Sequence, residues 1–302
     1  MKAVVLHEYG GPDKLKYEDV PDPVAGDGEV LVRVTATSIN PIDFKLRSGA
    51  MKGVYPLELP TILGRDISGI VRTVGKGVTG FNPGDKVMAL GNKAYAELAV
   101  VSAKDLALVP DKLDLVKAAA LPLVSLTGEQ LITQGTRIQA GQTVLVSGAA
   151  GNVGRSAVWT AKKAKALVIA GVKKSQLKEA ETLGADQVLA LDDAAAMGKL
   201  GFIDAVADTV GGETAAMLLG KVKQGGIFAS VLGPPKNAAM HPTIKIEAVR
   251  AVPDARTLRT MAEDAAAGKF VIPIDRMVPL ADAAEAQSAA EKGSIGKILL
   301  LT

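Results

Sequence analysis

The segment VLVSGAAGNVG, residues 144–154, carries the strongest structural signal in this 302-residue chain. It joins an apolar run to a turn of small residues, and the stretch that follows, 153–164, carries its apolar residues on one helical face. The pattern predicts a buried strand, a tight turn and a helix packed on the strand. Apolar runs recur at 166–172, 187–191, 203–212 and 226–233, with helical stretches between them. This alternation predicts an α/β fold, in which crossover helices cover a parallel sheet.

The small-residue turn predicts a dinucleotide-binding loop. Small residues let the backbone approach a pyrophosphate, and the free amides and positive dipole at the helix start favour its negative charge. Ala149 replaces the first glycine of the usual GxGxxG spacing, so the motif alone is a weak match. The interpretation as a dinucleotide loop rests on the motif together with the strand before it and the helix after it. A purely structural turn is the alternative. The candidate cofactor contacts are Ala150, Gly151, Asn152, Val153 and Gly154, of which Gly151 and Gly154 allow the close approach.

The end of the second predicted strand indicates which dinucleotide binds. NAD-specific proteins carry a carboxylate about twenty residues after the phosphate loop, where it binds the ribose hydroxyls. This chain has Lys173, Lys174 and Ser175 at that place and no carboxylate. Two ammonium groups and a hydroxyl suit a ribose phosphate, so we expect NADPH rather than NADH. Alternatively, the lysines only solvate a helix start and Ser175 only caps it.

The remaining sequence predicts a second, irregular and mostly β domain. Residues 1–121 contain short strand-like runs separated by turn signals. Strands are predicted at 3–6, 29–37, 69–74 and 86–89, and the final GKILLLT predicts a strand that returns to this domain. We therefore expect one domain formed by residues 1–121 and 266–302, and a dinucleotide-binding domain formed by residues 122–265.

Composition excludes several functional classes. The net charge is only +3 and 3% of residues are aromatic, so neither a basic surface nor stacking platforms for nucleic acid are expected. The chain has no cysteine, which excludes disulfides, thiolate metal sites and a cysteine nucleophile. The first residues lack the apolar core of a signal peptide, and no apolar run reaches the about 18 residues of a membrane span. We expect a soluble, cytoplasmic protein that does not engage a membrane.

Eight short motifs occur in order along the chain. They are NPIDFK at 40–45, LGRDISG at 63–69, GDKV at 84–87, AYAE at 94–97, AALP at 119–122, AAGNVG at 149–154, DTVGG at 208–212 and GKILL at 296–300. With them the sequence resembles the zeta-crystallin-like, zinc-independent quinone oxidoreductase and enone reductase branch of the medium-chain dehydrogenase/reductase superfamily. The resemblance implies a GroES-like catalytic domain, a Rossmann cofactor domain, NADPH as cofactor, and hydride transfer to a quinone or to the conjugated double bond of an α,β-unsaturated carbonyl. It also implies a small-molecule substrate and a homodimer formed at a sheet edge, for which residues 226–233 are the candidate strand.

The resemblance assigns roles to individual residues. Asn40 stands where zinc alcohol dehydrogenases have a catalytic cysteine, and Arg65 and Asp66 stand where they have the metal-binding histidine and glutamate. No zinc ligand set is therefore expected, and without a Lewis acid neither is the oxidation of simple alcohols. Asn40, Lys45 and Thr127 are expected beside the nicotinamide, and Lys45 is expected to stabilise a developing enolate or to guide the cofactor.

Further candidates complete the predicted site. Asn40, Lys45 and Tyr55 are the catalytic candidates, with Tyr55 as a proton donor for which water or a merely surface tyrosine is the alternative. Asp43 is expected to order the segment around Asn40 through local backbone hydrogen bonds. The remaining cofactor candidates are Val210, Leu232, Gly233 and Lys297.

Two other functions remain open. The same fold could carry a carbonyl reductase or an enoyl-thioester reductase, which a screen of substrates with NADPH would separate. The chain could also be an NADPH-binding protein with little turnover, acting as a sensor or as an RNA-binding protein. NADPH binding without oxidation by any quinone or enone would support that reading.

Overall fold

The computed structural model describes residues 1–293 and 296–302, and within them the chain forms two compact units. Unit 1 consists of residues 1–123 and 253–302, and unit 2 of residues 124–252. The sequence placed the second boundary after residue 265, whereas this division precedes helix α8 (Ala255–Ala266). Helix α8 packs against strand β8 (Leu106–Leu108) of unit 1, a tertiary contact that the local sequence does not reveal.

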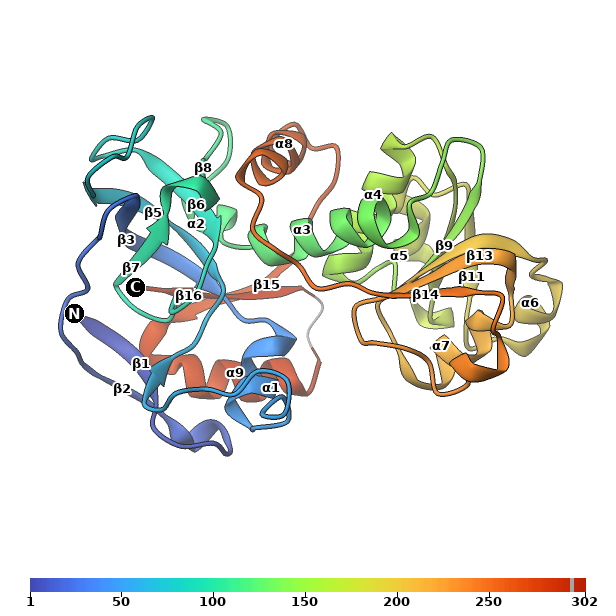
Figure 1. The fold of residues 1–302 in the computed structure, drawn as a ribbon, viewed down its shortest axis with the longest axis horizontal. Helices are drawn as coiled ribbons and strands as arrows, with labels where there is room; N and C mark the ends of the chain where they lie inside the picture. The colour runs from blue at the N-terminus through green and yellow to red at the C-terminus, as the bar shows by residue number, and fades with distance from the viewer. Residues whose placement is uncertain (294–295) are drawn as a thin grey trace. The chain divides into compact units, whose positions relative to one another are not determined.

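Unit 2 is a six-stranded sheet with helices between its strands (Figure 1). The strand order is β11-β10-β9-β12-β13-β14, and every adjacent pair is parallel. Counted along the unit, this is the order 3-2-1-4-5-6 of the doubly wound Rossmann fold, so the predicted architecture is confirmed. The strands are β9 (Thr143–Ser147), β10 (Leu167–Val172), β11 (Gln187–Ala190), β12 (Ile203–Asp208), β13 (Val222–Ser230) and β14 (Lys245–Ala248). The α-helices are α4 (Asn152–Lys163), α5 (Leu177–Ala180), α6 (Ala194–Lys199) and α7 (Gly212–Leu219), and α3 (Pro122–Gln130) enters the unit from unit 1.

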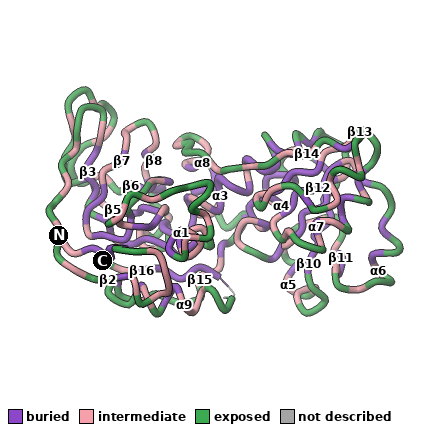
Figure 2. Tube along the Cα trace, turned by 60° about the horizontal axis from the view of Figure 1, so that its bottom comes forward, coloured by how far each residue is buried: buried purple, intermediate pink, exposed green. Residues whose placement is uncertain are grey.

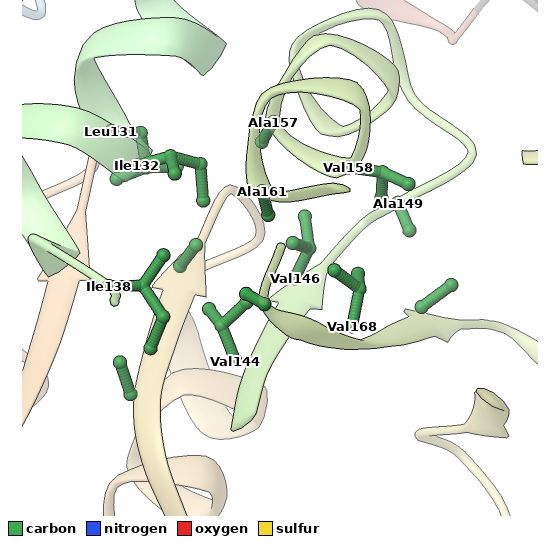
Figure 3. Close-up of a cluster of buried hydrophobic side chains, with 14 of the residues drawn as sticks. Leu131, Ile132, Ile138, Val144, Val146, Ala149, Ala157, Val158, Ala161 and Val168 are labelled. Atoms are coloured by element: carbon green, nitrogen blue, oxygen red, sulfur yellow. The ribbon is translucent and has the colours of Figure 1, made fainter. Parts of the chain in front are cut away.

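Strand β9 shows how both faces of this sheet are buried. Val144 and Val146 belong to the cluster on the face covered by α4, and Figure 3 shows Val146 next to Ala161 of that helix. Leu145, between them, belongs to the cluster on the other face, together with residues of α6 and α7. A strand buried on both faces carries no polar alternation, which explains why these strands stand out in the sequence as continuous apolar runs.

The edge of the sheet is not the strand that was predicted. Residues 226–230 lie in β13, which pairs with β12 on one side and with β14 on the other. The prediction that 226–233 forms the edge is therefore wrong, and β14 is the outermost strand on that side. Its four residues, KIEA, are partly or fully exposed and lack the apolar run by which strands were predicted. The homodimer itself stays a prediction.

Unit 1 is mostly β-structure, as predicted for a GroES-like domain (Figure 1). One sheet has the order β15-β16-β3-β5-β6-β8 with β7 paired to β3, and a smaller sheet has the order β2-β1-β4. Figure 2 shows the central strands β3, β5 and β16 largely buried. The strands are β1 (Lys2–Leu6), β2 (Leu15–Asp19), β3 (Glu29–Ser38), β4 (Thr61–Ile62), β5 (Asp66–Val74), β6 (Lys86–Leu90), β7 (Leu98–Ser102), β15 (Ile274–Pro279) and β16 (Lys297–Leu301), and the helices besides α8 are α1 (Pro41–Arg47), α2 (Leu115–Ala118) and α9 (Ala283–Glu291).

The helices of both units are short. Two of them, α4 and α8, have 12 residues each, and α4 carries a buried face between polar ends. In the part of the chain that the structure describes, we find no helix with the length and apolar character needed to cross a membrane.

Candidate functional site

Two turns of unit 2 lie side by side at the centre of its sheet. Strands β9 and β12 are neighbours there, although they are the first and fourth strands of the unit, and the helices after them, α4 and α7, cover opposite faces. Ligands of doubly wound sheets bind outside the carboxyl ends of the strands at this kind of switch point. The turns are residues 148–151 after β9 and residues 209–211 after β12.

Glycines shape the turn after β9. Gly148 has a φ of +65°, which favours glycine, and its carbonyl accepts the N–H of Gly151 at 2.9 Å. A Cβ on Gly154 would lie 2.1 Å from the Gly148 oxygen and 2.7 Å from the Cα of Ala149. A Cβ on Gly151 would meet only the Gly148 oxygen, at 3.1 Å. Helix α4 therefore begins in direct contact with the turn, so that its first amides can approach a ligand closely.

Arg155 holds the other side of this turn. Its Nε donates to the carbonyl of Ala150 at 2.9 Å, and its guanidinium also binds the Glu179 carboxylate. Asn152 and Val153 are partly exposed at the start of α4, where backbone N–H groups have no partner within the helix. Sequence reasoning missed Arg155, because Glu179 lies 24 residues away and no motif links the two.

Asp208 joins the carboxyl ends of three strands. Its buried carboxylate accepts the hydroxyls of Ser147 on β9 and Ser230 on β13, both at 2.7 Å. It also accepts the N–H groups of Val210 and Gly211, at 3.1 and 3.0 Å. Four donors compensate the cost of burying the charge and fix the turn after β12 against the neighbouring strands. The sequence contained Asp208 in a motif but suggested no role for it.

The predicted phosphate-binding residues lie just after β10. Lys173 and Ser175 are exposed, and the Lys173 ammonium forms no ion pair within the described residues. Lys174 donates its N–H to Asp192 at 2.7 Å, and its ammonium lies 3.5 Å from the Asp193 carboxylate. These two acids follow the adjacent strand β11, so they were not recognised as neighbours of the lysines. The ammonium of Lys173 is therefore more available to an anion than that of Lys174.

A small pocket lies beside the turn after β12. Its volume is about 280 Å³, and Leu232 and Gly233 line it. Val210 and Leu232 are 47% and 48% exposed, which leaves both side chains accessible. Thr127 lies on α3 and is 8% exposed. Leu232 and Gly233, which follow β13, thus share this pocket with Gly211 and Gly212, which follow β12.

A closed polar cluster lies at the start of α1 in unit 1. Lys297 donates to Asn40 Oδ1 at 2.6 Å and to Asp66 Oδ2 at 3.2 Å. Asn40 Nδ2 donates to the same carboxylate oxygen at 2.8 Å, and the Ser38 hydroxyl also binds it. The other oxygen of Asp66 accepts the N–H of Leu123 at 2.6 Å. The three residues Asn40, Asp66 and Lys297 are at most 2% exposed, so both ends of the Asn40 amide are engaged inside unit 1.

Asp43 begins a second buried polar chain next to this cluster. Its Oδ2 accepts the N–H of Asn40 at 2.8 Å, which confirms that Asp43 orders this segment, and the hydroxyl of Tyr95 at 3.0 Å. Burial raises the pKa of the Asp43 carboxyl to about 6, an effect that the two hydrogen bonds offset only in part. Gln287 donates to the Tyr95 hydroxyl and accepts from Arg47, so the chain links α1 to α9.

The raised pKa of Asp43 makes a prediction about stability. Since the folded state holds the proton more tightly, Asp43 favours folding below its ordinary pKa of 3.8 and loses that contribution as pH rises to about 6. Asp43→Asn keeps an acceptor for the Asn40 N–H but does not titrate. Relative to the parent protein, the variant should gain about 3 kcal/mol between these pH values, because each pKa unit corresponds to about 1.4 kcal/mol. Urea unfolding across this pH range measures the difference.

The control for this prediction is Asp111→Asn, which changes an exposed carboxylate in the same unit. The free energy of unfolding of this control should follow that of the parent protein at every pH. Parallel pH profiles for Asp43→Asn and the parent protein would show that burial does not raise the pKa of Asp43.

Three further side chains of unit 1 reach solvent. Lys45 on α1 is partly exposed, and its ammonium has no hydrogen-bond or ion-pair partner among the residues that the structure describes. Arg65 is also partly exposed, and its Nε is buried without a hydrogen bond. Tyr55 is 38% exposed in the segment between α1 and β4. Because Asp43 and Asp66 bind other groups, Lys45 and Arg65 keep their positive charges available.

The residues of unit 1 do not fit a zinc ion. The chain has no cysteine, and its described residues contain no group of three or more His, Cys, Asp or Glu side chains that could hold a metal. Zinc takes three or four nitrogen, sulfur or carboxylate ligands, and the cluster around Asn40 supplies one carboxylate. That carboxylate, Asp66, is already bound by the Lys297 ammonium.

Comparisons with known proteins agree with this architecture. Residues 26–111 match the alcohol dehydrogenase GroES-like domain family, and residues 183–300 match the zinc-binding dehydrogenase family. A chloroplast envelope quinone oxidoreductase homolog from Arabidopsis thaliana is 37% identical over 199 residues, which cover 63% of this chain and 60% of that relative's length. The quinone oxidoreductase structure from Coxiella burnetii is 29% identical with a TM-score of 0.89, covering 100% of this chain and 99% of that one. A mycobacterial protein solved in complex with NADPH is 30% identical with a TM-score of 0.85, and the match covers 100% of both chains.

Proposed function

The chain belongs to the medium-chain dehydrogenase/reductase superfamily, and from this premise we propose that it is an NADPH-dependent oxidoreductase that works without zinc. Its substrate is a quinone or the conjugated double bond of an α,β-unsaturated carbonyl. Unit 2 holds the cofactor, and unit 1 supplies groups that act on the substrate. The quinone oxidoreductases among its relatives support the substrate class.

The observation that carries this proposal is the turn between β9 and α4. It lies at the switch point of a sheet with the Rossmann strand order, and Gly154 lets the helix start press against it. The free amides of that helix start would hold the pyrophosphate of a dinucleotide. Residues 173–175, directly after β10, include no acidic residue, and the exposed Lys173 and Ser175 favour a cofactor with a ribose phosphate. The mycobacterial relative in complex with NADPH supports the same choice.

The side chains of unit 1 suit reduction of a conjugated acceptor. When bound, NADPH supplies the hydride. Hydride addition to the acceptor leaves negative charge on its carbonyl oxygen, which a nearby cation stabilises. We assign this task to Lys45, whose partly exposed ammonium has no partner within the described chain. Tyr55, or water, supplies the proton that completes the product.

Conjugation explains why no Lewis acid is needed. In a quinone or an enone the carbonyl group already polarises the carbon that accepts the hydride, so the main task of the protein is to hold the reactants in place. Asn40 serves that task by starting helix α1, on which Lys45 lies, since its own amide is engaged with Lys297 and Asp66. Saturated alcohols, by contrast, need a Lewis acid or a strong base to ionise the hydroxyl.

A panel of acceptors tests the proposal. The purified protein is mixed with NADPH and, in turn, with benzoquinones, naphthoquinones, enones, enoyl thioesters, saturated aldehydes and saturated ketones, and the oxidation of NADPH is followed by absorbance. We expect turnover with quinones or enones and none with the saturated carbonyl compounds. Turnover confined to saturated aldehydes would show a carbonyl reductase, and turnover confined to enoyl thioesters would show an enoyl-thioester reductase. Tight binding of NADPH without oxidation by any acceptor would show a binding protein instead.

A further inference from the structure

The family to which residues 183–300 belong is described as zinc-binding, yet a lysine lies where unit 1 gathers its buried oxygen atoms. Lys297 is 2% exposed, and its Nζ lies 2.6 Å from Asn40 Oδ1, 3.2 Å from Asp66 Oδ2 and 3.4 Å from the carbonyl oxygen of Ile39. An ammonium has three N–H donors, and three oxygen atoms surround this one. The Lys297 side chain therefore sits as a cation in a complete oxygen shell.

Within the buried cluster of Asn40, Asp66 and Lys297, the positive charge of the Lys297 ammonium balances the negative charge of the Asp66 carboxylate. Asp66 is 0% exposed, and a buried carboxylate left without a cation is strongly unfavourable. Its two oxygens accept from Ser38, Asn40, Lys297 and the N–H of Leu123. The Lys297 ammonium supplies the only positive charge among these donors, so it alone can neutralise Asp66 within the cluster.

The ammonium also fixes the orientation of Asn40. With Oδ1 toward Lys297 and Nδ2 toward Asp66, each end of the amide faces the opposite charge. A flipped amide would place its N–H donors against the ammonium and its oxygen against the carboxylate. Since Asn40 is the N-cap of α1 and its N–H is bound by Asp43, this cluster determines where α1 begins.

We propose that the Lys297 ammonium is a built-in cation, which neutralises and organises the buried oxygen ligands of unit 1 as a bound metal ion would. Through this cluster Lys297 acts as a positioning residue for helix α1 and for Lys45. It neutralises Asp66, orients Asn40 and ties β16 to β3 and β5, while touching neither substrate nor cofactor. This role differs from the cofactor contact expected for Lys297 from the sequence. The inference relies on the proposed reductase activity for its kinetic readout only.

The positioning role and a cofactor contact predict opposite kinetics. If Lys297 places Lys45, Lys297→Met lowers kcat about tenfold or more, which corresponds to about 1.4 kcal/mol in the barrier, and leaves the Kd for NADPH nearly unchanged. If Lys297 contacts the cofactor, the Kd for NADPH rises and kcat changes little. Fluorescence titration with NADPH and steady-state rates with the best quinone or enone separate the two results, and the second would overturn the proposal.

The double variant Lys297→Met with Asp66→Asn separates stability from positioning. It removes both charges of the Asp66–Lys297 ion pair, so position 66 no longer holds a buried carboxylate without its cation, and the variant should fold even if Lys297→Met alone does not. We expect it to bind NADPH like the parent protein and to remain slow in turnover, because nothing holds the Asn40 amide. A wild-type kcat in the folded double variant would overturn the proposal.

Chemical rescue tests the cation directly. Lys297→Ala leaves a buried space in which propylammonium can replace the lost side chain, whereas tetramethylammonium has no N–H to donate. We expect propylammonium chloride to raise both kcat and the melting temperature of Lys297→Ala, and tetramethylammonium chloride at equal ionic strength to raise neither. Equal effects of the two salts would contradict the proposal. If no acceptor is ever reduced, the proposed function fails, and the melting temperatures still test the built-in cation.

Metal analysis of the parent protein is the last test of the proposal. A cation encoded in the chain predicts no stoichiometric zinc and no loss of turnover or stability after treatment with a strong chelator. One zinc ion per chain, together with turnover that the chelator abolishes, would overturn the proposal.

Discussion

Replacing Gly154 by valine should weaken NADPH binding about 100-fold or more, which corresponds to about 2.7 kcal/mol. A Cβ at this position would lie 2.1 Å from the Gly148 oxygen and 2.7 Å from the Cα of Ala149. Both are backbone atoms, so the turn or the start of α4 must move, and the amides that would hold the pyrophosphate move with it. Isothermal titration of the variant with NADPH measures the loss.

Two further glycines serve as references for this prediction. Gly151→Ala adds a Cβ that meets only the Gly148 oxygen, at 3.1 Å, so its effect should be much smaller. Gly198→Ala, on α6 of the same unit, adds a Cβ that meets nothing within 4 Å and should leave binding unchanged. Circular dichroism shows whether each variant is folded. A folded Gly154→Val that keeps the parent affinity would show that the turn is only structural.

Removing both lysines after β10 should weaken NADPH binding by about tenfold or more and leave NADH binding nearly unchanged. A charge-assisted hydrogen bond to a phosphate is worth roughly 1.5 to 3 kcal/mol, whereas NADH offers only hydroxyls at the same place. Lys173→Ala should account for more of the loss than Lys174→Ala, because the Lys174 ammonium already lies 3.5 Å from Asp193. Titrations with both cofactors, for each single variant and the double variant, measure these contributions.

Lys178→Ala is the matched control, since it removes an exposed lysine from the helix that follows. Its NADPH affinity should equal that of the parent protein. Salt gives a second check, because recognition of a phosphate at an exposed site should weaken as ionic strength rises. The assignment of NADPH fails if the parent protein prefers NADH, or if the double variant keeps its full preference for NADPH.

Unit 2 was easier to predict from the sequence than unit 1. Strands buried on both faces, such as β9 and β10, contain long apolar runs, and the turn at 148–151 joins one of them to a helix with a clear apolar face. Strand β14 was missed, because an edge strand of four partly exposed residues carries neither an apolar run nor an alternation. The same reasoning therefore named the wrong edge of the sheet.

The candidate site was predicted where motifs are local and missed where contacts are tertiary. Asp43 and Asn40 are three residues apart, and their hydrogen bond followed from that spacing. Asp66 and Lys297 are 231 residues apart, so no sequence pattern could show that they form an ion pair. Arg155 and Asp208 were missed for the same reason, since each acts through partners on other elements.

Unit 1 is formed by two separate segments of the chain, residues 1–123 and 253–302, and the ribosome makes the second segment only after all of unit 2. At roughly 5 to 20 residues per second, the 231 residues between Asp66 and Lys297 take about 10 to 50 seconds to translate. Through that interval Asp66 lacks its counter-charge and β3 lacks β16 as its neighbour. Residues 124–252 leave the ribosome as one continuous stretch, so unit 2 can fold while unit 1 is still incomplete. Unit 2, whose synthesis begins after that of unit 1, is therefore expected to fold first.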